Sequence, residues 1–337
     1  MDQSKATATE ELEAQLPTPL TEHRLVDGST IWCKRDGLSG ASYGGNKLRK
    51  LAALLTKAKQ QRRNHIVTVG AAGSHHVLAT SLFGQREGMG VSAVLLPQQD
   101  SPHVRQVLAA TARSGCAVLP AKGPRDATRI VRSLVRKFGR DNIFWLGPGG
   151  LGPTGSLPYA DAVAELELQL KLHQLPAPQR LLVPVGSGST AVGLAVGLAE
   201  SSLRAVVHGV AVGNTPALRH ILDAQLALLA RRRSPKRWRA LFREARERLV
   251  LDERWAGRGY GKSTATAELA MAEESSIGLP LEITYTAKAL GAAKSMPRSA
   301  GETIFWHTLS ERDPNLPDST SPPAGPTPLR HLLMASP

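Results

Sequence analysis

Apolar positions along the chain alternate between short β-type runs and stretches with apolar residues every three or four positions. The first pattern predicts strands and the second predicts helices. Strands are expected at 29–35, 65–69, 91–96, 116–119, 142–146, 181–185, 208–212, 282–286 and 303–308. Helices are expected at 47–63, 77–85, from 101 onward, and at 127–138, 159–173, 191–198 and 265–275. Because strands alternate with helices, the pattern predicts an α/β fold of parallel sheets covered by helices, with three layers (αβα).

Length and loop composition favour two domains. A chain of 337 residues exceeds the usual size of one domain, and a stretch rich in glycine and proline at 147–155 is a natural hinge. Residues 1 to about 20 are expected to form a loose segment. The chain after Arg312 is rich in proline and serine, which predicts a disordered tail.

The charge pattern raises the question of nucleic-acid binding. The formal net charge is +14, and Arg231–Arg248 holds nine basic residues against two glutamates. Leu241, Phe242, Ala245 and Leu249 recur there at helical spacing, which is typical of a solvated helix with one apolar stripe. Aromatic residues are sparse, so a surface that stacks bases is not expected. We therefore do not expect a nucleic-acid partner.

Other compositional features point to an ordinary intracellular protein. No run of about 18 uncharged apolar residues occurs, so no membrane partner is expected. The polar N-terminus predicts a cytoplasmic location. Cys33 and Cys116 have neither metal-ligand spacing nor a disulfide framework, and no metal site is expected.

The stretch Ser42–Leu51, with the sequence SYGGNKLRKL, places a lysine where a flexible turn enters an amphipathic helix. Two glycines allow unusual backbone angles and a close approach to a ligand. A lysine that is desolvated in such a place has a lowered pKa and can act as a Schiff-base nucleophile. The alternative is that Lys47 is one more surface lysine of a basic chain, and the turn alone does not decide between them.

A second stretch, Val183–Leu198, has the features of a phosphate site. A predicted strand leads through Gly186-Ser187-Gly188-Ser189-Thr190 into a predicted helix. Backbone N–H groups at a helix N-terminus bind anions, and the hydroxyls add donors. An ordinary tight turn would not require so many small residues in succession.

Three other motifs are weaker. Gly147–Gly152 fits G-x-G-x-x-G, but Pro153 and Gly155 interrupt the helix that should follow, and no acidic residue ends the next strand. Gly261-Lys262-Ser263 lacks the first glycine of a P-loop. His75 and His76 are adjacent and cannot share one helix face as metal ligands do. They suit an anion or cofactor-hydroxyl contact at a helix N-terminus, or an ordinary first helical turn.

Together these stretches resemble one family, the pyridoxal-phosphate (PLP) enzymes of the tryptophan-synthase-β type, or fold type II. The closest resemblance is to the branch with D-cysteine desulfhydrase and 1-aminocyclopropane-1-carboxylate (ACC) deaminase. Gly44–Leu51 is similar to the cofactor-lysine motif and Gly186–Thr190 to the phosphate loop. Further motifs are similar at Ser74-His75-His76, Gly259-Tyr260-Gly261, Tyr285-Thr286-Ala287-Lys288-Ala289 and His307-Thr308.

The resemblance implies a role for each motif. Lys47 would bind PLP covalently and move the Cα proton, with Asn46 beside it. The cofactor phosphate would be held by Gly186, Ser187, Gly188, Ser189 and Thr190. Ser74, His75 and His76 would receive the substrate carboxylate, with His75 also near the phenolic oxygen of the cofactor. Tyr260 and Tyr285 would lie near the reacting carbons, Thr286 near the substrate, and Thr308 at the pyridine nitrogen.

The resemblance also implies a reaction, a domain division and an assembly. Thr286 stands where the deaminases have glutamate, which favours α,β-elimination on D-cysteine over ACC deamination, because a hydroxyl protonates the ring nitrogen less firmly than a carboxyl group. A catalytically weakened PLP-binding protein is the alternative of another class, since His75, Leu309 and the C-terminus depart from the family pattern. The large domain is expected at 1–45 plus 150–311, the small domain at 46–149, the tail at 312–337, and the assembly is expected to be a homodimer.

Overall fold

The computed structural model describes residues 14–296, 303–313 and 329–334. The chain divides into two compact units. In the larger unit, the structure describes Ala14–Lys50 and Leu151–Arg312 except residues 297–302. In the smaller unit, it describes Leu51–Gly150, Asp313 and residues 329–334. Helix α2 (Asn46–Gln60) contributes its first five residues to the larger unit and the others to the smaller. The domain limits expected from the sequence, including 46–149, remain predictions.

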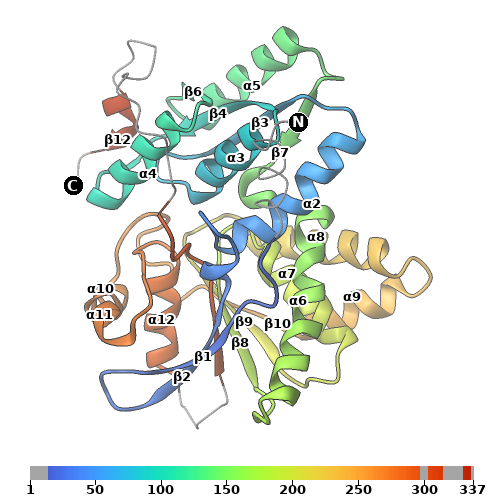
Figure 1. The fold of residues 1–337 in the computed structure, drawn as a ribbon, viewed down its shortest axis with the longest axis vertical. Coiled ribbons are helices and arrows are strands. Elements are labelled where there is room, and N and C mark those ends of the chain that lie inside the picture. The colour runs from blue at the N-terminus through green and yellow to red at the C-terminus, as the bar shows by residue number, and fades with distance from the viewer. Residues whose placement is uncertain (1–13, 297–302, 314–328, 335–337) are drawn as a thin grey trace, which may run out of the picture. The chain divides into compact units, whose positions relative to one another are not determined.

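The larger unit is built on a six-stranded sheet (Figure 1). Its order is β1 (Leu20–Arg24), β2 (Thr30–Arg35), β11 (Thr303–His307), β8 (Arg180–Val185), β9 (Val206–Ala211) and β10 (Leu249–Asp252). Neighbouring strands are parallel except β1 and β2, which are antiparallel. The sequence did not predict β1, which begins at Leu20, where the segment expected to be loose ends. Residues 1–13 lie outside the described part.

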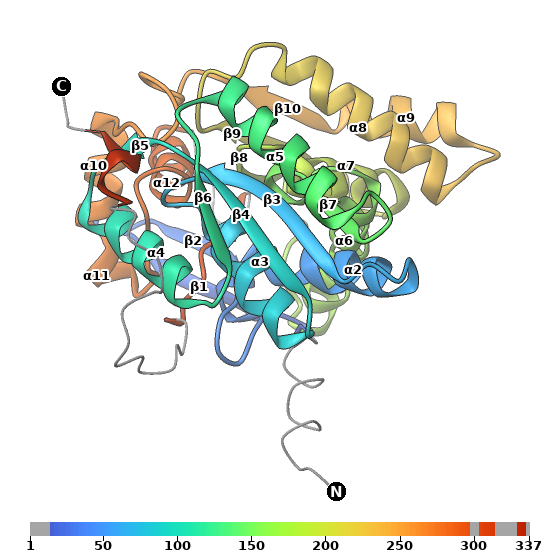
Figure 2. The same ribbon diagram turned by 90° about the horizontal axis from the view of Figure 1, so that it is seen from above.

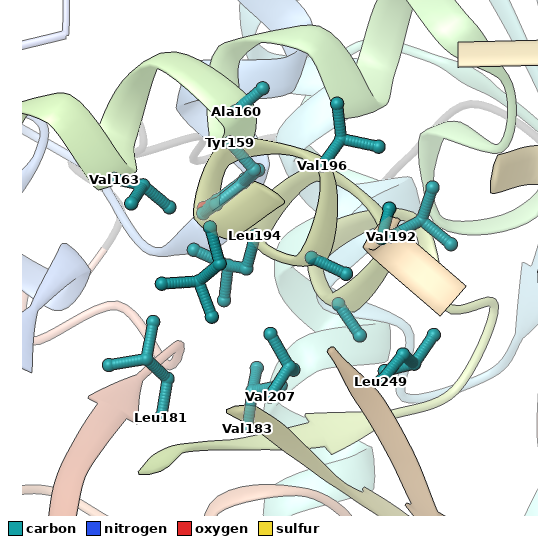
Figure 3. Close-up of a cluster of buried hydrophobic side chains, with 14 of the residues drawn as sticks. Tyr159, Ala160, Val163, Leu181, Val183, Val192, Leu194, Val196, Val207 and Leu249 are labelled. Atoms are coloured by element: carbon teal, nitrogen blue, oxygen red, sulfur yellow. The ribbon is translucent and has the colours of Figure 1, made fainter. Parts of the chain in front are cut away.

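Helices cover both faces of this sheet, which confirms the three-layer prediction. One face carries α6 (Pro153–Leu172), α7 (Ser189–Glu200), α8 (Leu218–Arg233) and α9 (Trp238–Glu247). The other carries α10 (Ala265–Ala272), α11 (Glu274–Ile277) and α12 (Thr286–Lys294). Successive strand side chains point to opposite faces: Leu181 and Val183 of β8 pack toward α7, as Figure 3 shows, and Leu182 packs with the α10–α12 layer.

The smaller unit has a four-stranded parallel sheet, seen from above in Figure 2. Its order is β6 (Ala117–Pro120), β4 (Gly90–Leu96), β3 (His65–Ala71) and β7 (Ile143–Leu146). One face packs against α3 (His75–Arg86) and α4 (Pro102–Arg113), and the other against α5 (Pro124–Phe138). Short strands β5 (Gln98–Gln99) and β12 (Leu333–Met334) pair alongside. The rest of the predicted disordered tail, 314–328 and 335–337, lies outside the described residues.

The predicted strand at 282–286 is wrong. Its branched and aromatic residues favour a strand, but the carboxylate of Glu282 accepts hydrogen bonds from the backbone N–H groups of Thr284, Tyr285 and Thr286, at 2.9, 2.6 and 3.0 Å. These bonds occupy donors that begin a helix and would otherwise lack an acceptor. Helix α12, which the sequence did not predict, therefore starts at Thr286.

Two helix predictions also need correction. Helix α6 begins at Pro153 rather than near residue 159, because proline is well suited to the first position of a helix. The prediction that Pro153 interrupts the helix after the G-x-G-x-x-G motif is therefore wrong. The basic stretch at 231–248 is the end of α8 and all of α9, separated at Ser234–Arg237, and Leu249 belongs to β10. No helix in the described ranges is long and apolar enough to cross a membrane.

Candidate functional site

The turn that carries Lys47 is fixed within the larger unit by hydrogen bonds to distant segments. The backbone N–H of Asn46 donates to the carbonyl of Thr308, at 3.0 Å, and its side-chain amide donates to the hydroxyl of Thr190, at 3.1 Å. Gly45 has φ of +81°, and a Cβ there would lie 2.7 Å from the carbonyl oxygen of Thr308. Glycine is therefore required for this approach.

The ammonium group of Lys47 lies among polar and aromatic groups with little charge compensation. Its Nζ donates to the side-chain oxygen of Asn46 and lies 5.7 Å from the ring centroid of Tyr285. Desolvation lowers the pKa of Lys47 from 10.5 to about 8, while the negative charge of Glu282 opposes this shift. A large share of Lys47 is therefore a neutral amine near pH 8, which is the nucleophilic form.

Tyr260 and Tyr285 form a hydroxyl pair beside Lys47. The hydroxyl of Tyr285 donates to that of Tyr260, at 3.1 Å, and the rings meet edge to face with centroids 5.7 Å apart. Desolvation of the hydroxyls raises the pKa of Tyr260 to about 12 and that of Tyr285 well above its ordinary value. Both phenols are therefore protonated at neutral pH and can donate hydrogen bonds.

The loop 186–190 lies at the N-terminus of α7. Gly188 adopts φ of +87°, and a Cβ on it would lie 2.1 Å from Leu222. Gly188 is buried, and its N–H has no acceptor among the described residues. The Ser187 carbonyl accepts a bond from Gln225 at 2.9 Å, and the hydroxyl of Ser189 bonds that of Ser156 at 3.0 Å. The free backbone donor, rather than the Ser189 hydroxyl, is available for an anion here.

The Gly186 position connects this loop to the tyrosine pair. A Cβ on Gly186 would lie 3.0 Å from Cε1 of Tyr285 and 3.1 Å from its hydroxyl oxygen. The structure thus brings five predicted positions together in one unit: Lys47, Asn46, Thr190, Gly186 and Tyr285.

The segment after β11 closes over the lysine turn. Thr308 is 7% exposed, and no described residue hydrogen-bonds its hydroxyl. The hydroxyl of Ser310 accepts a bond from the N–H of Gly44, at 2.9 Å, and Glu311 pairs with Arg35. Leu309, which departs from the family pattern, and Ser310 pack against the turn and leave the Thr308 hydroxyl without a bond to a described residue.

Thr286 has a different position from the one expected for a substrate contact. It is fully buried, and its hydroxyl accepts a bond from the N–H of Glu282, at 2.8 Å, within the cap of α12. It therefore has no exposed surface to offer a substrate in this conformation. Its contribution is to hold the helix that carries Tyr285.

The predicted carboxylate motif lies in the smaller unit, at the start of α3. The Ser74 hydroxyl accepts a bond from the N–H of Val77, at 3.3 Å, as the helix N-cap. Nε2 of His75 lies 2.9 Å from Nε2 of His103 on α4. His76 is 5% exposed and its Nε2 lies 3.3 Å from the hydroxyl of Thr68. His75 and His76 thus have different surroundings despite their adjacency.

Sequence reasoning missed four polar residues of these sites. They are Lys50, Glu282, Gln225 and His103. Lys50 is 4% exposed, and burial together with the charge of Lys47 lowers its pKa well below 10.5. Its place three residues after Lys47, on the same helix face, could have indicated this. Glu282 gave no separate signal, because the helix α12 that it caps was not predicted from the sequence. The other two residues meet their partners only through the fold.

Comparison with known proteins gives the family of the chain. The model for the family described as "Pyridoxal-phosphate dependent enzyme" matches residues 12–308. Nocardicin C-9' epimerase of Nocardia uniformis subsp. tsuyamanensis is 34% identical over 197 residues, 56% of this chain and 59% of that protein. D-cysteine desulfhydrase of Klebsiella pneumoniae is 27% identical over 315 residues, 87% of this chain and 91% of that protein.

Solved structures give the same fold. A crystal structure described as that of an ACC deaminase homologue has a TM-score of 0.69 and 23% identity, and the match covers 92% of this chain and 96% of that one. The chain spans 54–59% of the length of the epimerase and two other curated relatives. The family model nevertheless covers most of the chain, and the chain therefore belongs to the family of pyridoxal-phosphate dependent enzymes.

Proposed function

We propose that the protein catalyses α,β-elimination on a small amino acid, with D-cysteine as the first candidate. The products would be pyruvate, ammonia and sulfide. The observation that carries this proposal is the partly neutral Lys47 beside Tyr285, on a turn tied to Thr190 of the phosphate loop. The D-cysteine desulfhydrase relative, which matches over most of both chains, supports the same reaction.

The residues of the larger unit fit PLP. The buried N–H of Gly188, which lacks an acceptor among the described residues, suits a phosphate oxygen at the N-terminus of α7. The Thr308 hydroxyl suits the ring nitrogen, and Lys47 suits the aldehyde carbon. Gly186, Ser187, Ser189 and Thr190 complete the proposed phosphate loop, and Gln225 braces it through the carbonyl of Ser187.

In the proposed reaction the chain's side chains position the substrate and move protons. When bound, the cofactor supplies an electron sink that weakens the Cα–H bond of the amino acid. Lys47, as a neutral amine, takes the Cα proton. The Tyr260–Tyr285 pair, protonated at neutral pH, donates a hydrogen bond to the departing sulfur. Glu282 keeps negative charge near Lys47, which limits the fall of the lysine pKa to about 8.

For the smaller unit, we propose that Ser74 and His75 bind the substrate carboxylate. The N-terminus of α3 supplies positive potential, and the Ser74 hydroxyl keeps its own proton for donation while it accepts the bond from Val77. His76 supports this segment through Thr68.

The proposed activity is tested by an amino-acid screen on the yellow, cofactor-loaded enzyme. We expect pyruvate and sulfide from D-cysteine, and much less from L-cysteine or ACC. Efficient opening of ACC with no product from either cysteine enantiomer would contradict the proposal and favour the deaminase alternative. Inversion at Cα without pyruvate would instead favour an epimerase. Cofactor binding without turnover of any amino acid would favour a catalytically weakened protein.

Cofactor uptake is expected to rise with pH through a midpoint near pH 8. The neutral amine of Lys47 is the reactive form, and with a pKa of about 8 roughly half is neutral at pH 8, against about 0.3% for a pKa of 10.5. The measurement is the rate at which visible absorbance develops when PLP is added to the cofactor-free protein, between pH 6.5 and 9.5. A rate that keeps rising tenfold per pH unit beyond pH 9 would contradict the lowered pKa.

The basic surface of α8 and α9 is expected to be peripheral to catalysis. The guanidinium carbon of Arg231 lies 4.2 Å from the ring centroid of Trp238. The side chain of Arg232 is exposed. Arg233 pairs with Asp161 and Glu200, so it is left intact. Replacement of Arg231 and Arg232 by glutamine should leave kcat/KM unchanged. Tight, sequence-selective DNA binding at physiological salt would contradict this view, because nonspecific binding weakens steeply with salt.

A homodimer and a cytoplasmic location remain proposals, which rest on the family resemblance and on the composition of the chain. Light scattering of the purified protein tests the first, and cell fractionation tests the second.

A further inference from the structure

Lys288 is a buried cation outside the groups assigned above. It is 0% exposed, and its Nζ donates to three backbone carbonyls, those of Val212 and Ala256 at 2.8 Å and that of Gly259 at 3.1 Å. An ammonium has three N–H donors and no acceptor, so the three carbonyls use all of them. Removal of this group would leave three buried or partly buried carbonyls without that donor.

The three carbonyls belong to the two segments that surround Tyr260. Val212 follows β9, and Gly213 after it lies so close to Tyr260 that a Cβ would be 2.9 Å from the tyrosine N atom. Ala256 and Gly259 belong to the loop that leads into Tyr260. In that loop Gly257, Gly259 and Gly261 have φ of +62°, +123° and +72°. Glycines in such conformations do little to restrict the backbone themselves, so the loop depends on external contacts for its shape.

Lys288 also lies on the helix that begins directly after Tyr285, the partner of Tyr260. It lies three residues after Tyr285, close to the start of α12, so both residues belong to one turn. The hydroxyl bond between Tyr285 and Tyr260 spans 3.1 Å, and Tyr260 is 39% exposed. The helix therefore holds one tyrosine directly and the loop of the other through the ammonium.

We propose that Lys288 is a positioning residue for the proposed elimination: by holding the 256–259 loop to α12, it places the Tyr260 hydroxyl against that of Tyr285. The expected effect on kcat rests on the proposed function, whereas the expected effect on the loop 256–259 does not. Desolvation lowers the pKa of Lys288 from 10.5 to about 8, while the negative charge of Glu282 opposes this shift.

The structural consequence is tested by limited trypsin cleavage of the cofactor-loaded protein. Arg258 is exposed within the loop, so its cleavage reports local opening. In Lys288→Met we expect cleavage after Arg258 to be at least about tenfold faster, with cleavage after the exposed Arg140 of the smaller unit unchanged. Lys171→Met, at a lysine that is 69% exposed on α6, should behave as wild type. An unchanged rate at Arg258, or equal acceleration at both sites, would overturn the proposal.

The kinetic consequence is tested by a double-mutant cycle with Tyr260→Phe. We expect Lys288→Met to lower kcat on the order of 100-fold with little change in KM and full cofactor absorbance, because the hydroxyl is misplaced rather than removed. The double variant should lose no more than Tyr260→Phe alone. If the fold-losses in kcat of the two single variants multiply in the double variant, Lys288 does not act through Tyr260. If wild type eliminates no amino acid, the proposed function fails while the cleavage result still decides the role of Lys288.

Discussion

Replacement of Lys47 by alanine is expected to abolish both the visible absorbance of bound cofactor and amino-acid turnover. The amine of Lys47 is the one group on the lysine turn with a pKa of about 8 and a place beside Tyr285. Its loss removes the cofactor attachment and the proton acceptor together, and the second effect alone is worth on the order of 10²–10⁴-fold in kcat. Visible spectra after dialysis and pyruvate release give the two readings.

The control for this prediction is Lys57→Ala on the same helix, which should keep both properties. Borohydride treatment of wild-type protein, followed by peptide mapping, should attach the cofactor to the peptide that contains Lys47. A visible band that survives dialysis in Lys47→Ala would show that another lysine, such as the buried Lys50, holds the cofactor.

Replacement of Asp36 by asparagine should destabilise the protein by about 3–5 kcal/mol. Asp36 is fully buried and accepts four hydrogen bonds. Its donors are Arg49 Nε at 3.0 Å, the Thr18 hydroxyl at 3.1 Å, the Tyr159 hydroxyl at 2.6 Å and Trp306 Nε1 at 2.8 Å. An amide would present N–H groups to some of these donors and would leave the charge of Arg49 less compensated. Urea unfolding of the cofactor-loaded protein measures the loss.

A surface ion pair provides the matched control for Asp36. Asp141 lies 3.5 Å from Arg63 and is fully exposed, so Asp141→Asn should leave the urea midpoint unchanged. Equal midpoints for Asp36→Asn and wild type would mean that the network around Asp36 contributes no net stability. The two terminal nitrogens of Arg49 also donate to the carboxylate oxygens of Glu165, each at 2.9 Å. We expect this pair to keep Arg49, and with it the start of α2, in place in Asp36→Asn.

The local parts of the fold were predictable because their signals are local. The alternation of strands and helices indicated the parallel pairing that both sheets share, apart from the antiparallel β1–β2 pair. Ser101-Pro102 indicated the start of α4, where the Ser101 hydroxyl accepts a bond from the N–H of Val104. The lysine turn and the loop at 186–190 were predictable because each combines glycines with a helix start. These features require only neighbouring residues.

The missed features depend on contacts between distant parts of the chain or on one side chain that changes the local preference. The Glu282 carboxylate converts a strand-like sequence into the start of α12. Asn46 and Thr190 are hydrogen-bonded across 144 positions, and Asp36 and Tyr159 across 123. Contacts over such separations cannot be predicted from the spacing of apolar residues. The burial of Thr286 likewise depends on the cap that Glu282 forms, which the sequence did not predict.

The hydrogen bonds between the lysine turn and the segment after β11 have a consequence for protein synthesis. Asn46 bonds Thr308 and Gly44 bonds Ser310, 266 positions later, so the lysine turn needs partners that are translated long after it. At about 5–20 residues per second, the ribosome needs roughly 13–50 s to make the intervening residues. During that time the nascent chain holds Lys47 without its final surroundings, and cofactor capture would thus report that translation has passed residue 310.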